Sequence, residues 1–344
     1  MRRITLKELA KELDLSISTI SKALNDSHEI SSETKAKIRE LAELRNYQPN
    51  VQAKFLKLGK TNNIGVIIST IVNPFQAQVI EAMHKEAMKY GFNLILMQSL
   101  DSEEMEEKAI QTLLHHGVDG ILISPAFCNS NIELLTSLNN NDCPIVIFDR
   151  ITSDLNTFKI GIDNFKSVYN AVIELLNIKR DKIALLCGKN IGISQERISG
   201  FITALKDNSL EIDPKMIVQC RHDYCSEEID KDLKIKITEL ISSDNRPNAI
   251  LGTTDTLTTR VLGILADMKI SVPEDIAVIG FSNSDIVNSL NPSLSTILQP
   301  TYKIAELAFE KMIELVNTKN RQRLNIKSIL LDTSIQLRQS TAVY

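Results

Sequence analysis

The part of the chain after residue 62 alternates short apolar runs with helical patterns, and no other feature restricts the possible folds as strongly. The first series of apolar runs comprises "NNIGVIIST", "FNLILMQS", "DGILIS" and "PIVIFD". A second series comprises "KIGID", "KIALLCG", "MIVQC", "AILGT" and "IAVIGF". Strands that alternate with helices over this length predict parallel sheets with helices on both faces. The two series predict two similar lobes that divide near residues 158–162.

Length and composition indicate a soluble protein of several domains. The 344 residues correspond to about two to three domains, and 43% hydrophobic with 24% charged residues is typical of globular chains. No apolar run approaches the roughly 20 residues of a membrane helix, and "MRRITLKELAKEL" lacks the apolar core of a secretory signal. With five cysteines and no CxxC pair, we expect reduced thiols, a cytoplasmic location and no membrane partner.

The charge of the chain is unevenly distributed. Residues 1–60 hold 12 Lys and Arg against 8 Asp and Glu, whereas the remainder holds 27 against 35. A basic head on an acidic body indicates that the head alone meets a polyanion. Because a chance imbalance could have this size, the inference depends on the layout of the head as well.

The head has the pattern of three short helices. Thr5 and Glu8 have the spacing of a capping box at the start of the first helix. Ser16 is a good N-cap for a second helix over residues 17–24, and Ser31 or Ser32 caps a third that ends near Asn46. Two short helices joined by a tight turn and braced by a third predict a helix-turn-helix unit.

The second helix combines an apolar inner side with a short polar outer side. Ile20, Ala23 and Leu24 lie on the inner side, and the hydroxyl-rich sequence has only moderate helix propensity. The outer side suits a DNA major groove, because hydroxyls can contact phosphates, a lysine can reach guanine acceptors and an isoleucine can press on a thymine methyl. The alternative is a helical hairpin that only packs. The outer side consists of Ile17, Ser18, Ser21, Lys22 and Asn25.

These residues resemble the head of the lactose-repressor (LacI/GalR-type) family of bacterial transcription regulators. The resemblance lies in "TLKELAKELDLSISTISKALN" followed by "ISSETKAKIRELAELRNYQPN". Lys22 departs from the arginine that is usual in the family, and lysine lacks the planar fork that binds guanine bidentately. With the hinge described next, the expected DNA-contacting residues are Thr5, Ser16, Ile17, Ser18, Thr19, Ser21, Lys22, Asn25, His28, Tyr47, Asn50, Ala53 and Leu56. His28 is included because it lies in the turn after the second helix, where it can meet a phosphate; the alternative is that it is only solvated.

The resemblance also implies a hinge over residues 49–61 that becomes helical on operator DNA. Ala53 and Leu56 match the A-x-x-L pattern in which the leucine enters the minor groove. A helix of under ten residues is marginal alone, and an apolar wedge can unstack and kink a base step. The alternative is an ordinary linker.

The body resembles the effector domain of the same family, which has the two-lobed fold of periplasmic sugar-binding proteins. The stretches that carry the resemblance include "IVNPFQAQVI", "GVDGILISP", "ISQERISGFITAL", "VPEDIAVIGFSN" and "LSTILQP". In that fold the chain crosses between the lobes three times, and we expect crossings near residues 161, 290 and 322. The ligand then lies at the carboxyl ends of the strands.

The resemblance implies a set of effector-binding residues in the cleft. An acid there accepts sugar hydroxyls, an arginine bridges ligand oxygens, and aromatic rings stack on a sugar's apolar face. At two positions the chain departs from the family, with Thr254 in place of an asparagine and Ser282 in place of an aspartate. The expected set is Phe75, Asp149, Arg197, Tyr224, Thr254, Asp255, Ser282 and Gln299. The alternatives are that Phe75 is only a core residue and Asp255 only a helix cap.

No motif in the chain predicts an enzyme, a cofactor or a metal site. Gly188 and Gly192 have the wrong spacing for a dinucleotide fingerprint, and there is no Walker motif. Cys220, His222 and Cys225 match no common zinc spacing and lack a fourth ligand. An α/β enzyme is therefore the weakest interpretation.

Together these features predict a cytoplasmic, sequence-specific transcriptional regulator, most simply a repressor, that binds near-palindromic operator DNA as a homodimer and responds to a sugar or sugar derivative. The alternative is a sugar-binding receptor of the periplasmic type without a DNA role. The expected organisation is an all-α DNA-binding domain at 1–48, the hinge at 49–61, and an effector-binding and dimerisation domain at 62–344. Its lobes are expected at about 62–160 with 291–321, and at about 161–290 with 322–344.

Overall fold

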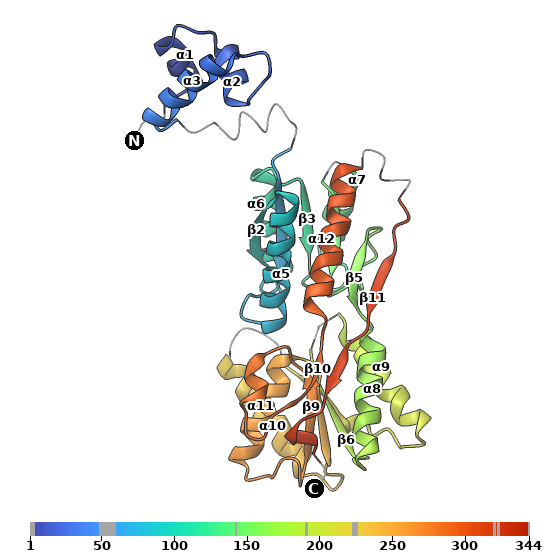
Figure 1. Ribbon diagram of the computed structural model, residues 1–344. Helices are drawn as coiled ribbons and strands as arrows, with labels where there is room; N and C mark the ends of the chain where they lie inside the picture. The colour runs from blue at the N-terminus through green and yellow to red at the C-terminus, as the bar shows by residue number, and fades with distance from the viewer. Residues whose placement is uncertain are drawn as a thin grey trace. The chain divides into compact units, whose positions relative to one another are not determined.

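The structure is a computed structural model that describes residues 4–47, 60–141, 143–189, 192–221, 226–318, 321 and 324–342 (Figure 1). The chain divides into two compact units, Met1–Thr61 and Asn62–Tyr344. Each unit has a hydrophobic core of its own.

The first unit contains the three expected helices, α1 (Leu6–Glu12), α2 (Ile17–Leu24) and α3 (Ser32–Leu44). Their starts are fixed by side-chain caps, because Thr5, Ser16 and Ser31 each accept a hydrogen bond from a backbone N–H of the first turn. The capping box of Thr5 and Glu8 is formed in full. Leu9, Ile20 and Ile38, one from each helix, are fully buried and form the centre of the core.

The second unit consists of two sheets whose strands are parallel, as the alternation predicts, except for one edge strand of the second sheet. The first sheet has the strand order β11-β5-β4-β3-β1-β2, and all of its pairings are parallel. Its strands are β1 (Asn63–Ile68), β2 (Asn93–Gln98), β3 (Gly120–Ile123), β4 (Ile145–Phe148), β5 (Lys159–Ile162) and β11 (Ser328–Leu331). Its helices are α5 (Pro74–Tyr90), α6 (Glu103–His115), α7 (Ile132–Asn140) and α12 (Thr301–Asn317).

The second sheet has the order β12-β10-β9-β8-β6-β7, in which only the pairing of β12 with β10 is antiparallel. Its strands are β6 (Ile183–Gly188), β7 (Ile217–Cys220), β8 (Ala249–Gly252), β9 (Ala277–Phe281), β10 (Ser295–Leu298) and β12 (Ser334–Gln336). Its helices are α8 (Asn164–Asn177), α9 (Ser194–Asp207), α10 (Ser226–Ile241) and α11 (Asp255–Asp267), and the single-turn helices are η1 (Pro214–Met216), η2 (Asp285–Asn288) and η4 (Gln339–Thr341).

The chain passes between the lobes three times, but two of the expected crossing points are wrong. The first lies at residue 163, between β5 and α8, close to the expected 161. The second lies at residues 299–300 instead of near 290, because β10 pairs with β9 before the chain returns to the first lobe as α12. The third lies at residues 332–333 instead of near 322, because β11 still pairs with β5. The run "KIGID" therefore belongs to the first sheet, between β4 and β11, and does not open the second lobe.

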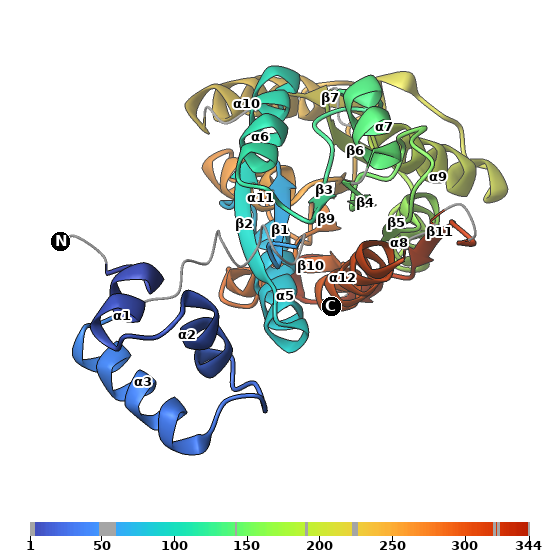
Figure 2. The same ribbon diagram turned by 90° about the horizontal axis from the view of Figure 1, so that it is seen from above.

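Helix packing brings the ends of several helices to the junction of the lobes. The helices α5 and α12 lie side by side in both views (Figure 1, Figure 2). Helix α11 approaches its sheet closely at Gly252 and Gly280, where an added Cβ would lie 2.3 and 2.4 Å from the Thr258 hydroxyl. This close approach holds the start of α11 at the carboxyl end of β8. Among the helices in the described part of the chain, none is long and apolar enough to span a membrane.

Candidate functional site

The outer side of α2 forms an exposed polar surface on the first unit. Ile17 is 47% exposed, and Ser18, Lys22 and Asn25 are also exposed, whereas Ser21 is half-buried. Ile20 and Ala23 are fully buried, so the apolar side of the helix faces the core, as predicted. The five predicted contact residues on this outer side therefore share one face of a helix that begins at a capped N-terminus.

The polar groups of this surface are engaged with one another. The hydroxyls of Ser16 and Thr19 are 2.8 Å apart, and the Asn25 side-chain amide donates to the Ser21 carbonyl at 2.8 Å. The Lys22 ammonium forms an ion pair with Glu29, and both side chains are about half exposed. The surface is thus presented in a fixed arrangement, and a partner that binds Lys22 must replace Glu29.

The remaining predicted contacts of the head lie around this surface or outside the described residues. Thr5 is exposed at the start of α1, and His28 is exposed between α2 and α3. Tyr47 is half-buried and packs against the core of the head, so part of its role is structural. Asn50, Ala53 and Leu56 lie outside the described residues.

A second candidate site is a narrow chamber of about 50 Å³ between the two lobes of the second unit. We call it the inner chamber. Its walls are formed where strands of both sheets end, in agreement with the placement expected for open α/β sheets. Seven of the eight residues that the sequence suggested for the cleft line it: Phe75, Asp149, Arg197, Thr254, Asp255, Ser282 and Gln299. Tyr224, and with it His222 and Cys225, lies outside the described residues.

Asp149 follows β4 directly and is held in an unusual backbone conformation. Its φ of 63° lies in the left-handed region, which costs energy for a residue other than glycine and is common at functional sites. Its Oδ2 accepts hydrogen bonds from Gln76 Nε2 at 2.9 Å and from Ser124 Oγ at 3.0 Å. Burial raises the pKa of Asp149, and the nearby Arg150 partly offsets this. A carboxylate accepts about four hydrogen bonds, so it keeps capacity for a ligand.

Arg197 lies on α9 and is only 4% exposed. Its Nε donates to Asn164 Oδ1 at 2.8 Å, and its Nη1 donates to the Thr253 carbonyl. The guanidinium carbon lies 3.7 Å from the centre of the Phe281 ring, which is a close cation–π contact. Burial lowers the pKa of Arg197 to about 10, and the charge of Asp149 acts against this shift. The group therefore remains a buried cation at neutral pH.

At the carboxyl end of β8, Thr254 and Asp255 begin α11. Thr254 is the N-cap, because its hydroxyl accepts a hydrogen bond from the Leu257 N–H at 3.3 Å. Asp255 is therefore not the cap; instead its Oδ1 accepts a hydrogen bond from the Ser282 hydroxyl. Burial raises the pKa of Asp255. The serine at position 282, a departure from the family pattern, thus partners the one acid on this side of the chamber.

Two buried amide oxygens in the inner chamber have no hydrogen-bond partner within the described residues. They are Gln76 Oε1 and Gln299 Oε1. The orientation of the Gln76 amide is set by its donation to Asp149, which directs the oxygen elsewhere. A buried acceptor without a partner costs about 1–3 kcal/mol. A ligand that carries two or more hydrogen-bond donors would remove this cost.

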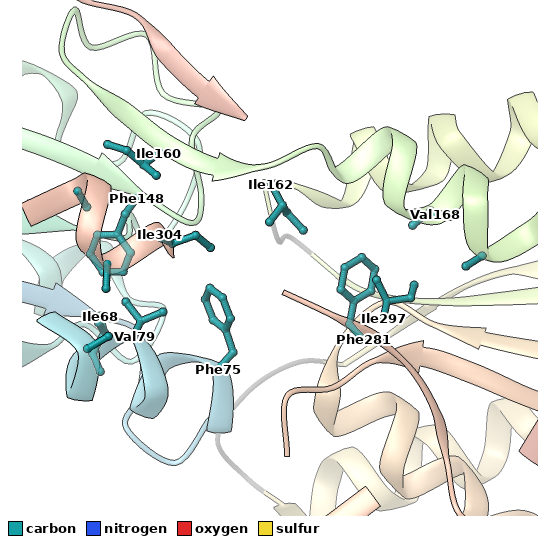
Figure 3. Close-up of a cluster of buried hydrophobic side chains, with 14 of the residues drawn as sticks. Ile68, Phe75, Val79, Phe148, Ile160, Ile162, Val168, Phe281, Ile297 and Ile304 are labelled. Carbon is teal, nitrogen blue, oxygen red and sulfur yellow. The ribbon is translucent and has the colours of Figure 1, made fainter. Parts of the chain in front are cut away.

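The lobes are joined next to this chamber by a small amide network. Gln78 Nε2, on α5 of the first lobe, donates to the Asn283 carbonyl of the second lobe at 2.7 Å. Asn283 Nδ2 donates to the Gln299 carbonyl at 2.8 Å, and its Oδ1 accepts from the Gln299 N–H at 3.1 Å. Figure 3 shows Phe75 and Phe281 on the two lobes that face this region. A ligand in the chamber therefore touches both lobes and the segment that connects them.

Sequence reasoning missed half of the chamber wall. Ser69 and Arg150 follow strands and could have been found from their position at strand ends. Gln76 shows no such signal, because its place in the chamber depends on which face of α5 turns toward Asp149. Phe281 was assigned to a strand without a role in the site. The residues that were not predicted are Ser69, Asn73, Gln76, Arg150, Ile193, Phe281 and Asn283.

Comparison with known proteins gives one consistent picture. Residues 5–50 match the model of the bacterial regulatory proteins of the lacI family, and residues 173–341 match a periplasmic binding protein-like domain. The ribose operon repressor of Haemophilus influenzae is 27% identical over 339 residues, which cover 98% of both chains. Catabolite control protein A of Priestia megaterium is 27% identical over 344 residues, covering 98% of this chain and 99% of that protein.

Solved structures agree with this picture. The lac repressor dimer bound to operator and the anti-inducer ONPF matches with a TM-score of 0.85 over 99% of this chain and all of that one. At 21% identity this match shows the fold. The transcription regulator CcpA of Lactococcus lactis, at 27% identity, matches with a TM-score of 0.71 over 81% of this chain and 99% of that one.

Proposed function

The chain belongs to the LacI family of bacterial regulatory proteins and is a DNA-binding transcriptional regulator, and from this premise we propose how its two units divide the work. The head binds a near-palindromic operator through α2 as part of a homodimer, since paired heads need half-sites related by two-fold symmetry. A carbohydrate-like effector binds between the lobes and controls repression. The relatives named as repressors, and the lac repressor dimer, support this proposal.

The exposed side of α2 supports the assignment of DNA contact to the head. Ile17, Ser18 and Lys22 lie together on one face of α2, and all three are exposed. In the major groove, Lys22 would supply a cation to guanine acceptors or a phosphate, and Ile17 would meet a thymine methyl. Phosphate contacts position the head, whereas these few side chains select the sequence.

The observation that carries the effector proposal is the pair of unpartnered amide oxygens in a chamber that both lobes line. Hydroxyl groups of a polyol donate hydrogen bonds to such oxygens and to the carboxylates of Asp149 and Asp255. The rings of Phe75 and Phe281 provide apolar surface for the C–H face of a sugar. The chemistry of the wall therefore suits a neutral polyhydroxylated ligand.

Control of DNA binding would follow from a population shift between two arrangements of the lobes. A ligand that donates to Gln76 on the first lobe and contacts Asp255 on the second favours the arrangement in which both reach it. Gln78 and Asn283 already link the lobes at this point. The ligand changes DNA affinity only by the difference between its affinities for the two arrangements.

The experiment that tests this function is selection of bound sequences from a pool of random duplexes by the full-length protein. We expect enrichment of a near-palindromic sequence at moderate salt, and its loss with Lys22→Ala combined with Ile17→Ala. Binding without any enriched sequence would contradict specific regulation, because non-specific binding depends on phosphate charge alone.

A further inference from the structure

A second, larger space adjoins the inner chamber at the mouth of the cleft. This outer chamber has a volume of about 650 Å³. Ser69, Asn73 and Asp255 line both spaces, so the two chambers are direct neighbours at these three residues.

The volumes of the two spaces differ by more than tenfold, and this difference limits what can bind. About 50 Å³ holds only a few water molecules, at roughly 10–15 Å³ each. Sites for complete small ligands have volumes of about 300–1,000 Å³. The inner chamber therefore accommodates one hydroxyl-bearing end of a ligand, and the outer chamber accommodates a body larger than that end.

The lining of the outer chamber combines apolar and polar side chains. On the first lobe, Ile71, Val72 and Leu100 are 48%, 85% and 41% exposed and lie beside the polar Thr70, Gln98 and Asp101. On the second lobe, the lining consists of the buried Ile229 of α10 and of Asp255, Thr256, Thr259 and Arg260 of α11. Exposed apolar side chains on one lobe and threonine hydroxyls on the other match a sugar ring, which has a C–H face and a hydroxyl edge.

Hydrogen bonds and an ion pair hold the loops that carry Ile71, Val72 and Leu100. Leu100 and Asp101 have φ values of 50° and 51°, two consecutive left-handed residues that are not glycine. The Leu100 N–H donates to the Ser69 carbonyl at 2.9 Å, and the Ile71 N–H donates to Gln98 Oε1 at 2.9 Å. Asp101 is held by an ion pair with the buried Arg150 at 2.6 Å. The exposure of Leu100 is therefore imposed by the structure at an energetic cost, as is common where a wall meets a ligand.

We propose that the effector is an oligosaccharide or glycoside of at least two units that binds end-on. The hydroxyl edge of its terminal unit enters the inner chamber and donates hydrogen bonds to Gln76 and Gln299, while the rest of that unit lies at the opening between the two chambers. The next unit lies in the outer chamber with its C–H face against Ile71, Val72 and Leu100 and its hydroxyls toward Thr256 and Thr259. This inference rests on the proposed carbohydrate control and specifies the size and orientation of the ligand.

The test measures thermal unfolding of the full-length protein with matched saccharide series. Each series contains a monosaccharide, its phosphate, and the disaccharide and trisaccharide made of the same unit, for glucose in both linkages, xylose, mannose and galactose. In one series we expect the disaccharide or trisaccharide to raise Tm by about 5 °C at a hundredfold excess over its Kd. The corresponding monosaccharide should produce less than a tenth of the stabilisation at equal concentration.

Two variants then locate the second unit. Leu100→Asn removes apolar surface at a left-handed position that asparagine tolerates better than leucine, so the fold should be retained. It should weaken binding of the disaccharide at least tenfold. Leu337→Asn is the matched control, because Leu337 is 52% exposed and lines neither chamber, and it should leave binding unchanged.

The outcomes separate this inference from the proposed function. A monosaccharide or its phosphate that stabilises as strongly as the longer saccharide would overturn end-on binding and leave carbohydrate control intact. An unchanged disaccharide affinity in Leu100→Asn would also overturn it. If no saccharide in any series changes Tm, the carbohydrate proposal itself fails, whereas DNA binding by the head is tested separately.

Discussion

The outer side of α2 and the wall of the inner chamber are both polar, but their polar groups are satisfied in different ways. On α2 the groups are exposed and already paired, as with Lys22 and Glu29 or Asn25 and the Ser21 carbonyl. In the chamber the groups are buried, and the oxygens of Gln76 and Gln299 lack partners in the described part of the chain.

From this difference we expect the two regions to recognise their proposed partners differently. On α2, DNA would exchange one set of solvent-exposed interactions for another, so each residue should contribute modestly and binding should depend on salt. In the chamber, a ligand would supply donors to buried acceptors, so a few residues should contribute strongly and a ligand without a donor at those positions should bind more weakly. Substitutions should therefore have larger effects in the cleft than on the head.

The largest effect is expected for Arg197→Ala. Removing the guanidinium leaves Asn164 Oδ1 and the Thr253 carbonyl without their donor and leaves a cavity beside Phe281. Effector affinity should fall at least about a hundredfold, and Tm should fall by several degrees. Titration calorimetry and thermal unfolding measure the two effects.

Arg197→Lys is the control for this variant, because lysine keeps the charge but not the planar fork or the ring contact. It should recover part of the lost Tm while effector binding remains weak. Operator affinity should change less than about twofold in both variants. If operator binding were lost together with Tm in Arg197→Lys, Arg197 would be a residue of folding and not of ligand binding.

On the head, Lys22→Ala should reduce DNA affinity by about tenfold. The loss of one phosphate or base contact should also lower the slope of log affinity against log salt by about one. Fluorescence anisotropy at several salt concentrations measures both. Lys37→Ala makes the same change of charge at an exposed ion pair on α3, and it should have a clearly smaller effect.

A smaller and opposite effect is expected for Glu29→Gln. Removing this acid frees Lys22 from its ion pair, so affinity for DNA should rise by about two- to fivefold, in keeping with the modest strength of exposed pairs. Glu33→Gln changes the net charge equally but releases Lys37 instead. The same gain in Glu33→Gln, or a gain that persists in Lys22→Ala, would show that general charge and not the pair is responsible.

The smallest effect is expected for Asp255→Asn, and it should depend on pH. Burial raises the pKa of Asp255 above its usual value, so the folded state holds this proton more tightly than the unfolded state. The free-energy cost of ionising Asp255 in the native chain therefore grows as pH rises from the unfolded-state pKa to the raised pKa, is complete above the raised pKa, and vanishes below the unfolded-state value. Tm of the variant should exceed that of the parent by about 1–3 °C at neutral pH and match it at pH 3.

The gain in Tm is limited because Asp255 lies in the first turn of α11, where an acid stabilises the helix by a few tenths of a kcal/mol. A variant whose Tm advantage grew as pH fell would contradict the assignment. Ligand affinity should decrease in the same variant.

Much of this structure could be predicted from local sequence signals. Helix starts in the head follow from hydroxyl caps at Thr5, Ser16 and Ser31, which act over three or four residues. The strands follow from apolar runs. The candidate cleft residues, Asp149 and Arg197 among them, followed from the resemblance to a family.

The remainder depends on contacts between distant parts of the chain. The late crossing at residues 299–300 depends on the pairing of β10 with β9, which no pattern in "LSTILQP" reveals. The role of Gln76 depends on how the start of α5 is placed relative to Asp149, 73 residues further along the chain. The hydrogen bond from Ser282 to Asp255 likewise depends on the pairing of β8 with β9, because the two residues follow the ends of these neighbouring strands.

The central claim is that the head and the cleft belong to one coupled regulator. The most direct test is the affinity of the full-length protein for its selected operator, measured with and without the saccharide that raises Tm most. We predict a change of about 5–150-fold, and the operator should change the affinity for the saccharide by the same factor. An operator affinity that stays constant at saturating saccharide would contradict the account.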